Sequence, residues 1–222
     1  MTPSVPHMDT GSILGGYRID GVAGQGGMGV VYRATQLGLD RPVALKVIAT
    51  ELATNVDFRT RFKSEAQLAA SIDHPNVVPV YEAGEAEGVL YLAMRYVEGT
   101  DLRSLVEDGG GGLAPERAVR IVWQVAAALD AAHRRGLVHR DVKPPNVLIA
   151  NEGEEHAYLT DFGLTKHAAQ SGGVTRTGQF VGTPDFVAPE QIRGESADAR
   201  ADIYALGAVL FHALTGLSLI HI

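Results

Sequence analysis

The sequence predicts an α+β chain in two lobes, the first rich in strands and the second mainly helical. Short β-branched and aromatic runs separated by Gly-rich or polar turns dominate residues 17–92, whereas helical composition prevails after Gly99. A hinge is expected at residues 95–99, between these two patterns. The predicted segments are a disordered arm rich in small and polar residues, a first lobe and a second lobe, at residues 1–14, 15–97 and 98–222.

Five strands and one helix are expected in the first lobe. The predicted strands are residues 17–22, 30–35, 42–48, 77–81 and 89–94, with a turn at 84–88. Residues 57–72 have the spacing of an amphipathic helix instead. The side chains predicted for its buried face are Phe58, Phe62, Ala69 and Ile72.

A long helix at residues 113–136 is expected in the second lobe, because Pro115 stands just inside its start and Gly136 marks its end. Its predicted apolar stripe is Val119, Val122, Ala126 and Leu129. Residues 203–220 contain no Asp, Glu, Lys or Arg, which approaches the length of a membrane span. Two glycines and a histidine interrupt them, so a buried core helix is the favoured interpretation.

Composition excludes several classes of protein. The 222 residues are 45% hydrophobic and 20% charged, as in ordinary globular proteins. The net charge of -7 argues against a nucleic-acid partner, and the absence of cysteine excludes disulfides and thiolate zinc sites. The N-terminus has neither the basic start nor the apolar run of a secretory signal.

A glycine-rich stretch, Gly24-Gln25-Gly26-Gly27-Met28-Gly29, fits the pattern G-x-G-x-x-G. It allows a hairpin turn, a dinucleotide fingerprint or a loop whose backbone N–H groups approach phosphates. The dinucleotide interpretation requires a following helix and an acidic residue about 20 positions later. Strand-forming residues follow instead, and Lys46 lies where the acid would be, so this interpretation is disfavoured.

Lys46 lies within an apolar predicted strand, and Glu65 lies on the apolar face of the predicted helix. Lys46 alone could be an edge-strand lysine that opposes aggregation. A carboxylate on an apolar face is costly unless it is paired, so we expect Lys46 and Glu65 to form an ion pair.

Three motifs follow in order: His139-Arg140-Asp141-Val142-Lys143-Pro144-Pro145-Asn146, then Asp161-Phe162-Gly163, then Ala188-Pro189-Glu190. Here the chain resembles the protein kinase family, and together with the earlier motifs the resemblance covers about residues 17–216. Residues 26–32 and 74–78 are similar to bacterial eukaryotic-like serine/threonine kinases. The resemblance implies a β-rich N-lobe with one regulatory helix and a mainly helical, incomplete C-lobe.

The resemblance implies a role for each motif residue. Asp141 would accept the proton of the attacking hydroxyl, and Lys143 would lie near the γ-phosphate, as in serine/threonine kinases. Asn146 and Asp161 would hold Mg²⁺ or Mn²⁺. Lys46 would contact the α- and β-phosphates of ATP, fixed by Glu65.

An ATP site is implied as well, with Met94 as the gatekeeper and residues 95–97 as the hinge that pairs with adenine. A flexible core methionine is an equally good account of Met94, and both can hold. The residues expected at this site are Val22, Gly24, Gly26, Gly27, Gly29, Val30, Ala44, Lys46, Met94, Arg95, Tyr96, Val97 and Leu148.

Regulation by phosphorylation is also implied. Thr175 and Thr177 lie where bacterial kinases of this kind are autophosphorylated, and Arg140 supplies the cation that a phosphate needs. The alternative is two solvated loop threonines. Thr183 resembles the threonine that supports the catalytic loop and is not expected to be a phosphosite. Asp202 is expected to accept hydrogen bonds from the backbone around His139 and Arg140.

The implied function is an ATP-dependent serine/threonine protein kinase that acts on protein substrates. The expected partner for trans-autophosphorylation is a second copy of the kinase. No nucleic-acid partner and no membrane segment are expected in this chain. The predicted location is the cytoplasm, although kinases of this kind often carry a membrane anchor outside the catalytic domain.

The pattern breaks near the end of the chain. Residues 217–222 do not resemble the Pro-rich loop that the family has next, and the arginine that pairs with Glu190 in the family is not found. Pro145 stands where the family more often has a small residue. The alternative function is therefore an inactive kinase fragment that binds only nucleotide or a partner.

Overall fold

The structure is a computed structural model and describes residues 7–26, 29–151, 155–162 and 184–219. The chain divides into two compact units. Unit 1 comprises Met1–Ser71 and Pro79–Tyr96, and unit 2 comprises Ile72–Val78 and Val97–Ile222. The boundary after Tyr96 lies within the expected hinge, but unit 2 also takes a short segment from the middle of the first predicted lobe.

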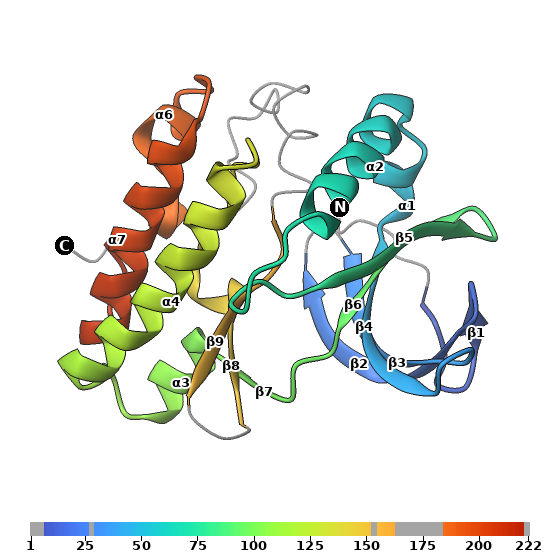
Figure 1. Cartoon of the computed structure of the whole chain (residues 1–222), viewed down its shortest axis with the longest axis horizontal. Coiled ribbons are helices and arrows are strands. Elements are labelled where there is room, and N and C mark those ends of the chain that lie inside the picture. Colours follow the sequence, from blue (N-terminus) through green and yellow to red (C-terminus); the bar gives the residue numbers. More distant parts are fainter. Residues whose placement is uncertain (1–6, 27–28, 152–154, 163–183, 220–222) are drawn as a thin grey trace. The chain divides into compact units, whose positions relative to one another are not determined.

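A six-stranded antiparallel sheet forms most of unit 1 (Figure 1). In the spatial order β1-β2-β3-β4-β6-β5, its strands are β1 (Ile13–Leu14), β2 (Tyr17–Gly26), β3 (Gly29–Gln36), β4 (Arg41–Ile48), β6 (Val89–Arg95) and β5 (Val80–Ala86). In β4, Val43, Leu45 and Val47 point into the core and have no exposed surface. Because side chains alternate along a strand, Ala44 and Lys46 share the opposite face.

Two helices complete unit 1, α1 (Thr50–Ala53) and α2 (Val56–Ala70). The side chain of Asn55 caps α2 by accepting a hydrogen bond from the N–H of Phe58 at 2.9 Å. The buried face of α2 contains Phe58, Phe62 and Ala69, as predicted, and it packs against β5. Ile72 is buried too, but it follows the helix and belongs to unit 2.

Unit 2 is mainly helical, with a three-stranded antiparallel sheet in the order β7-β8-β9. Helices α4 and α7 lie side by side in it (Figure 1). Its elements are β7 (Gly99–Asp101), α3 (Leu102–Asp108), α4 (Pro115–His133), η1 (Pro144–Asn146), β8 (Val147–Ala150), β9 (His156–Leu159), η2 (Pro184–Phe186), α6 (Pro189–Ile192) and α7 (Ala199–Thr215).

The segment Ile72–Val78 is fastened to unit 2 by Asn76, which is 8% exposed. The side-chain amide of Asn76 donates to the carbonyl of Ala157 at 2.9 Å and to Oε1 of Gln124 at 3.0 Å. Its backbone carbonyl accepts from the N–H of Leu159 at 2.8 Å, and Val78 donates back to Leu159 at 3.0 Å. These bonds connect the segment to both β9 and α4.

The structure corrects the predicted N-terminal arm. Ile13 and Leu14 form β1, which pairs with Arg18 and Tyr17 of β2. Leu14 is 1% exposed within the core of unit 1. The prediction of a loose arm as far as residue 14 is wrong, because it followed the polar residues before Leu14 and gave this apolar side chain no weight.

The predicted stripe of α4 is also wrong. Val119 is 54% exposed, and the buried positions of α4 include Ile121 and Val125 instead. The predicted Leu129 is buried, whereas Val122 and Ala126 are only half-buried. Most residues of this helix are apolar, so their spacing alone does not define which face is buried.

Two smaller differences concern strands and turns. The strand predicted at residues 77–81 begins at Val80, and the turn after it is confined to Glu87 and Gly88, which both have positive φ. Helix α7 (Ala199–Thr215) corresponds to the buried helix expected at residues 203–220, but it begins before Ile203 and ends at Thr215. No helix within the described ranges has the length and hydropathy needed to cross a membrane.

Candidate active site

The catalytic loop predicted from the sequence lies in unit 2, between α4 and β8. The carboxylate of Asp141 is mostly shielded, and its Oδ2 atom lies 2.9 Å from Nζ of Lys143. The side-chain amide of Asn146 lies 3.3 Å from the same oxygen and donates to the backbone carbonyl of Asp141 at 2.8 Å. The structure thus brings these three predicted residues together.

Asp161 is joined to this loop through the backbone of its neighbour Thr160. The N–H of Thr160 donates to the carbonyl of Asn146 at 3.0 Å. The carbonyl of Thr160 accepts from Nε2 of His139 at 2.9 Å. Asp161 itself has φ of 60°, a left-handed conformation that is uncommon outside glycine. Asn146 and Asp161 are therefore positioned by one continuous hydrogen-bonded backbone.

His139 is completely buried and forms the centre of this arrangement. Since its Nε2 donates to a carbonyl, its Nδ1 is left to accept the N–H of Asp141, at 3.2 Å. Burial lowers the pKa of His139, which favours this neutral form. Its ring also packs against Phe162, with 4.8 Å between ring centroids. His139 thus links the catalytic loop to the segment containing Asp161.

Asp202, near the start of α7, holds the other side of the loop. It has no exposed surface and accepts hydrogen bonds from the N–H groups of His139 at 2.8 Å and Arg140 at 2.7 Å. These are the backbone contacts expected from the resemblance. Arg140 has φ of 62°, and both N–H bonds restrain the chain at this strained residue.

Two contributors to the loop were missed by the sequence analysis. Nε2 of His133, at the end of α4, donates to Oδ2 of Asp202 at 2.7 Å. Gln191, in α6, donates from Nε2 to the carbonyl of Arg140 at 3.0 Å. Gln191 follows directly after Ala188-Pro189-Glu190, so its position next to a predicted motif was the available signal.

The donors around Asn146 fit a divalent cation. Both hydrogen bonds of its side chain to the described residues use the amide nitrogen, so its Oδ1 is not occupied by a hydrogen bond within this part of the chain. An amide oxygen together with the carboxylate of Asp161 offers the hard ligands that Mg²⁺ prefers, usually completed by phosphates and water. No cluster of three or more His, Asp or Glu ligands occurs among the described residues.

Unit 1 contains most of the residues predicted for nucleotide binding, whereas Val97 and Leu148 belong to unit 2. In the sheet register Ala44 lies opposite Met94, and Lys46 lies opposite Leu92. Met94 is 5% exposed, whereas Ala44 and Lys46 are half-buried. One face of the sheet therefore presents an apolar pair with a lysine beside it. This combination suits an aromatic base with phosphates attached.

The prediction of Val30 is wrong. Its side chain lies in the core of unit 1, on the side of Val43 and Leu45. Val31 is paired with Lys46 in the register and lies on the same face as that lysine. A shift of one residue moves a side chain to the other face of a sheet, and the prediction took the first of two adjacent valines, although the family pattern G-x-G-x-x-G-x-V points to the second.

The glycines of the loop differ in what surrounds them. A Cβ atom on Gly29 would lie 1.9 Å from the carbonyl oxygen of Val47, so the packing of β3 against β4 requires glycine there. A Cβ on Gly24 or Gly26 would meet nothing within 4 Å. The fold of unit 1 thus leaves open space at these two glycines, which a phosphate could approach. Gly27 lies outside the described residues.

The remaining predicted residues have these positions. Lys46 and Glu65 are both half-buried, on β4 and α2, and Oε2 of Glu65 is shielded from solvent; their ion pair stays a prediction. Five further residues were predicted to bind ATP, and they lie in β2, in the hinge and in β8. Val22 and Arg95 are exposed, whereas Tyr96, Val97 and Leu148 are half-buried. Those outside the described residues are Gly163, Thr175, Thr177 and Thr183.

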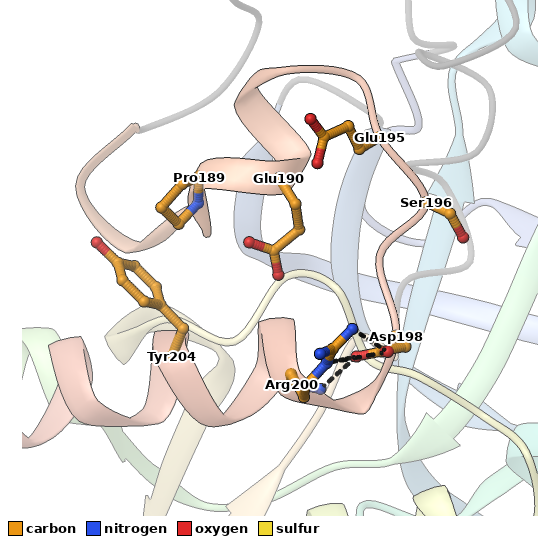
Figure 2. Close-up of a pocket in the computed structure, with 7 residues that line it drawn as sticks. All are labelled: Pro189, Glu190, Glu195, Ser196, Asp198, Arg200 and Tyr204. Atoms are coloured by element: carbon orange, nitrogen blue, oxygen red, sulfur yellow. Dashed lines mark hydrogen bonds and ion pairs between the residues drawn. The ribbon is translucent and has the colours of Figure 1, made fainter.

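A pocket of about 450 Å³ lies between α6 and the start of α7. Figure 2 shows Glu190 and Glu195 in its wall, with the ion pair of Arg200 and Asp198 across from Glu190. Among the described residues no ion pair or hydrogen bond involves the carboxylate of Glu190.

Comparisons with known proteins agree with this geometry. The family described as Protein kinase domain matches residues 17–221. The serine/threonine-protein kinase PknJ of Mycobacterium tuberculosis is 44% identical over 211 residues, which make up 94% of this chain and 35% of PknJ. PknD of the same species is 45% identical over 216 residues, 97% of this chain and 32% of PknD.

The solved kinase domain of M. tuberculosis PknI is 35% identical, with a TM-score of 0.78, over 94% of this chain and 77% of that domain. The chain thus spans about a third of the length of the curated relatives it matches and about three quarters of the solved domain. With its motifs in order and its catalytic loop assembled, the chain belongs to the protein kinase family.

Proposed function

We propose that this chain transfers the γ-phosphoryl group of ATP to serine or threonine hydroxyls of proteins. The observation that carries the proposal is the contact of the Asp141 carboxylate with both Lys143 and Asn146. Phosphoryl transfer depends mainly on positioning and on neutralising negative charge. The proposal is further supported by the names of the relatives, which are serine/threonine-protein kinases.

Asp141 is the proposed general base. Its carboxylate accepts a hydrogen bond from the substrate hydroxyl, orients that oxygen and takes its proton as the bond to phosphorus forms. The ammonium group of Lys143 lies 2.9 Å from Asp141 and provides positive charge beside the acceptor oxygen. A base that is held by neighbouring groups loses less rotational freedom when the substrate binds.

The other proposed roles concern ATP. Asn146 and Asp161 hold Mg²⁺ or Mn²⁺, which neutralises phosphate charge when it is bound. Lys46 binds the α- and β-phosphates, and Glu65 orients it. The backbone at Gly24 and Gly26 approaches the phosphates. The remaining proposed contacts, which surround the adenine, are Val22, Val31, Ala44, Met94, Arg95, Tyr96, Val97 and Leu148.

Regulation belongs to the same proposal. Autophosphorylation of Thr175 or Thr177, by a second copy of the chain, places a dianionic group near Arg140 and neutralises that cation. The proposed substrates are proteins with accessible serine or threonine residues. The proposed location is the cytoplasm, which supplies both ATP and Mg²⁺.

The experiment incubates the purified chain with ATP and Mg²⁺ and measures phosphate on Thr175 and Thr177 by mass spectrometry. Asp141→Asn is expected to lower the rate about 100-fold or more, since it removes the base. Asp130→Asn is the matched control, because Asp130 is an exposed residue of α4 whose ion pair among the described residues is with its neighbour Arg134. Its rate is expected to stay at the wild-type level.

The alternative, a fragment that binds only nucleotide or a partner, is distinguished by the same preparation. A chain that binds ATP with Mg²⁺ but incorporates no phosphate would contradict the proposed activity and support this alternative. The observation that favours it is the pocket at Glu190, whose carboxylate makes no ion pair or hydrogen bond with the described residues.

A further inference from the structure

Gln191 connects two motifs that lie far apart in the sequence. Its side-chain Oε1 accepts a hydrogen bond from the N–H of Ala188 at 3.2 Å, at the start of α6. Its Nε2 donates to the backbone carbonyl of Arg140 at 3.0 Å, across 51 positions of sequence. One amide group thus binds both the A-P-E segment and the residue immediately before Asp141.

The Arg140 carbonyl belongs to the peptide group that joins Arg140 to Asp141. The N–H of this same peptide group donates to Nδ1 of His139 at 3.2 Å. The peptide plane is therefore held at both edges, by Gln191 on its oxygen and by His139 on its nitrogen. Because the plane carries the Cα atom of Asp141, its orientation determines where the Asp141 side chain points.

The backbone at this point is strained and requires such restraints. Arg140 has φ of 62°, a left-handed conformation that is unfavourable for a residue with a side chain. Its N–H is held by Asp202 at 2.7 Å, and its carbonyl is held by Gln191. Strained residues persist only where surrounding contacts over-determine them. Without Gln191, the carbonyl side of this restraint is lost.

We propose that Gln191 is a positioning residue for Asp141, and that it couples the conformation of the A-P-E segment to the orientation of the catalytic base. The inference rests on the proposed kinase function. Gln191 acts through the Arg140–Asp141 peptide and touches neither ATP nor the acceptor. A shift of residues 188–191 that moves its amide releases the Arg140 carbonyl, and Asp141 then loses its fixed direction.

The first test compares Gln191→Ala and Gln191→Glu. The glutamate keeps the size of the side chain and an acceptor for the Ala188 N–H, but it places a carboxylate oxygen against the Arg140 carbonyl. The expected kcat is about 3–10-fold lower for Gln191→Ala and lower again for Gln191→Glu, with KM for ATP changed less than about 2-fold. Gln67→Glu, at an exposed position of α2, is the matched control and retains wild-type kcat.

The second test is independent of activity. Hydrogen exchange of the Arg140 and Asp141 amides is measured by NMR or mass spectrometry for the same three variants. Both Gln191 variants are expected to exchange faster at these amides than wild type and Gln67→Glu. A melting temperature recorded for each variant confirms that the compared proteins are folded.

The outcomes separate the two proposals. Wild-type kcat and wild-type exchange in folded Gln191→Glu overturn the role of Gln191, whatever the activity of the chain. A lower melting temperature with kcat per folded molecule unchanged also overturns it, because the role is then only structural. Faster amide exchange in a chain whose wild type incorporates no phosphate supports the restraint and contradicts the kinase function instead.

Discussion

Glu82 and Asp202 are both carboxylates that bind several donors, but they do so in contrasting surroundings. Glu82, an exposed residue of unit 1, accepts from the hydroxyls of Tyr17 at 2.6 Å and Tyr91 at 2.8 Å. Asp202, in unit 2, has no exposed surface and accepts from two backbone N–H groups and from His133. The first network connects side chains, and the second fixes the path of the backbone.

The contrast shows that a carboxylate can either stabilise contacts between side chains or hold the backbone of a loop in one conformation. Water can replace a lost partner at an exposed site, so the net value of each hydrogen bond there is small. Asp202 has no exposed surface, so the loss of an acceptor oxygen there leaves a shielded N–H group unsatisfied. The fold around Glu82 should therefore tolerate substitution, whereas the loop bound to Asp202 should lose both stability and catalytic geometry.

Asp202→Asn is expected to have the largest effect. The asparagine nearly preserves the shape but replaces one acceptor oxygen with a donor, which faces a backbone N–H or the Nε2–H of His133. The free energy of unfolding is expected to fall by about 3 kcal/mol, and kcat should fall with it. Urea denaturation measures the first and a kinase assay the second.

Asp198→Asn is the control for this variant. Asp198 caps the same helix by accepting the N–H of Arg200, but its side chain is 57% exposed. Asparagine caps helices about as well as aspartate, so a change of less than about 0.5 kcal/mol is expected. Equal losses for both variants would break the contrast between a buried carboxylate and an exposed one.

Glu82→Gln is expected to have a smaller effect. The glutamine retains one acceptor oxygen for the two tyrosine hydroxyls, and the predicted loss is about 1 kcal/mol with kcat unchanged. Glu85→Gln is the matched control, since Glu85 forms a surface ion pair with Arg59, and it should lose less than about 0.5 kcal/mol. A reduced kcat in folded Glu82→Gln would show that unit 1 uses this network for catalysis as well.

The smallest effect is expected from alkaline titration of the tyrosines. Burial, and then the hydrogen bond to Glu82, raises the pKa of Tyr91 from 10.0 to about 12. The same causes raise the pKa of Tyr17. Between pH 10 and 12 the unfolded chain has lost the Tyr91 proton that the folded chain keeps, so stability is full below pH 10 and falls as pH rises.

Melting temperatures recorded across this pH range measure that slope. Tyr91→Phe removes the titrating group and should give a shallower decline than wild type. Tyr204→Phe, at a 45% exposed position of α7, should decline as wild type does. Identical slopes for all three proteins would contradict a protective role for burial at Tyr91.

The sequence predicted most elements where a local signal was strong. The helix predicted at residues 113–136 is present as α4 and begins at Pro115, two residues later than predicted, and β-branched runs located most strands of unit 1. Local sequence patterns failed where adjacent residues have chemically similar side chains. Strand propensity did not separate the two adjacent valines of β3, and the nearly uniform apolar composition of α4 concealed which of its faces is buried. In both cases contacts with other elements determine which side chains are buried.

The residues of the candidate site also fall into two groups, those that the sequence predicted and those that it missed. The spacing of Asp141, Asn146 and Asp161 matched a family motif, so they could be predicted, and the backbone contacts of Asp202 followed from the same resemblance. His133 and Gln191 could not be assigned, because their partners lie 69 and 51 positions away. No local pattern encodes a hydrogen bond at that separation.

The attachment of Ile72–Val78 to unit 2 has a consequence for synthesis on the ribosome. Asn76 is made 81 positions before Ala157, whose carbonyl binds it. At the usual rates of translation this delay lasts about 4–16 s. During that interval most of unit 1 has been synthesised, whereas residues 72–78 still lack their hydrogen-bond partners in β9. We therefore expect a nascent chain halted before β9 to be cleaved by protease at residues 72–78, and one extended past β9 to be protected there.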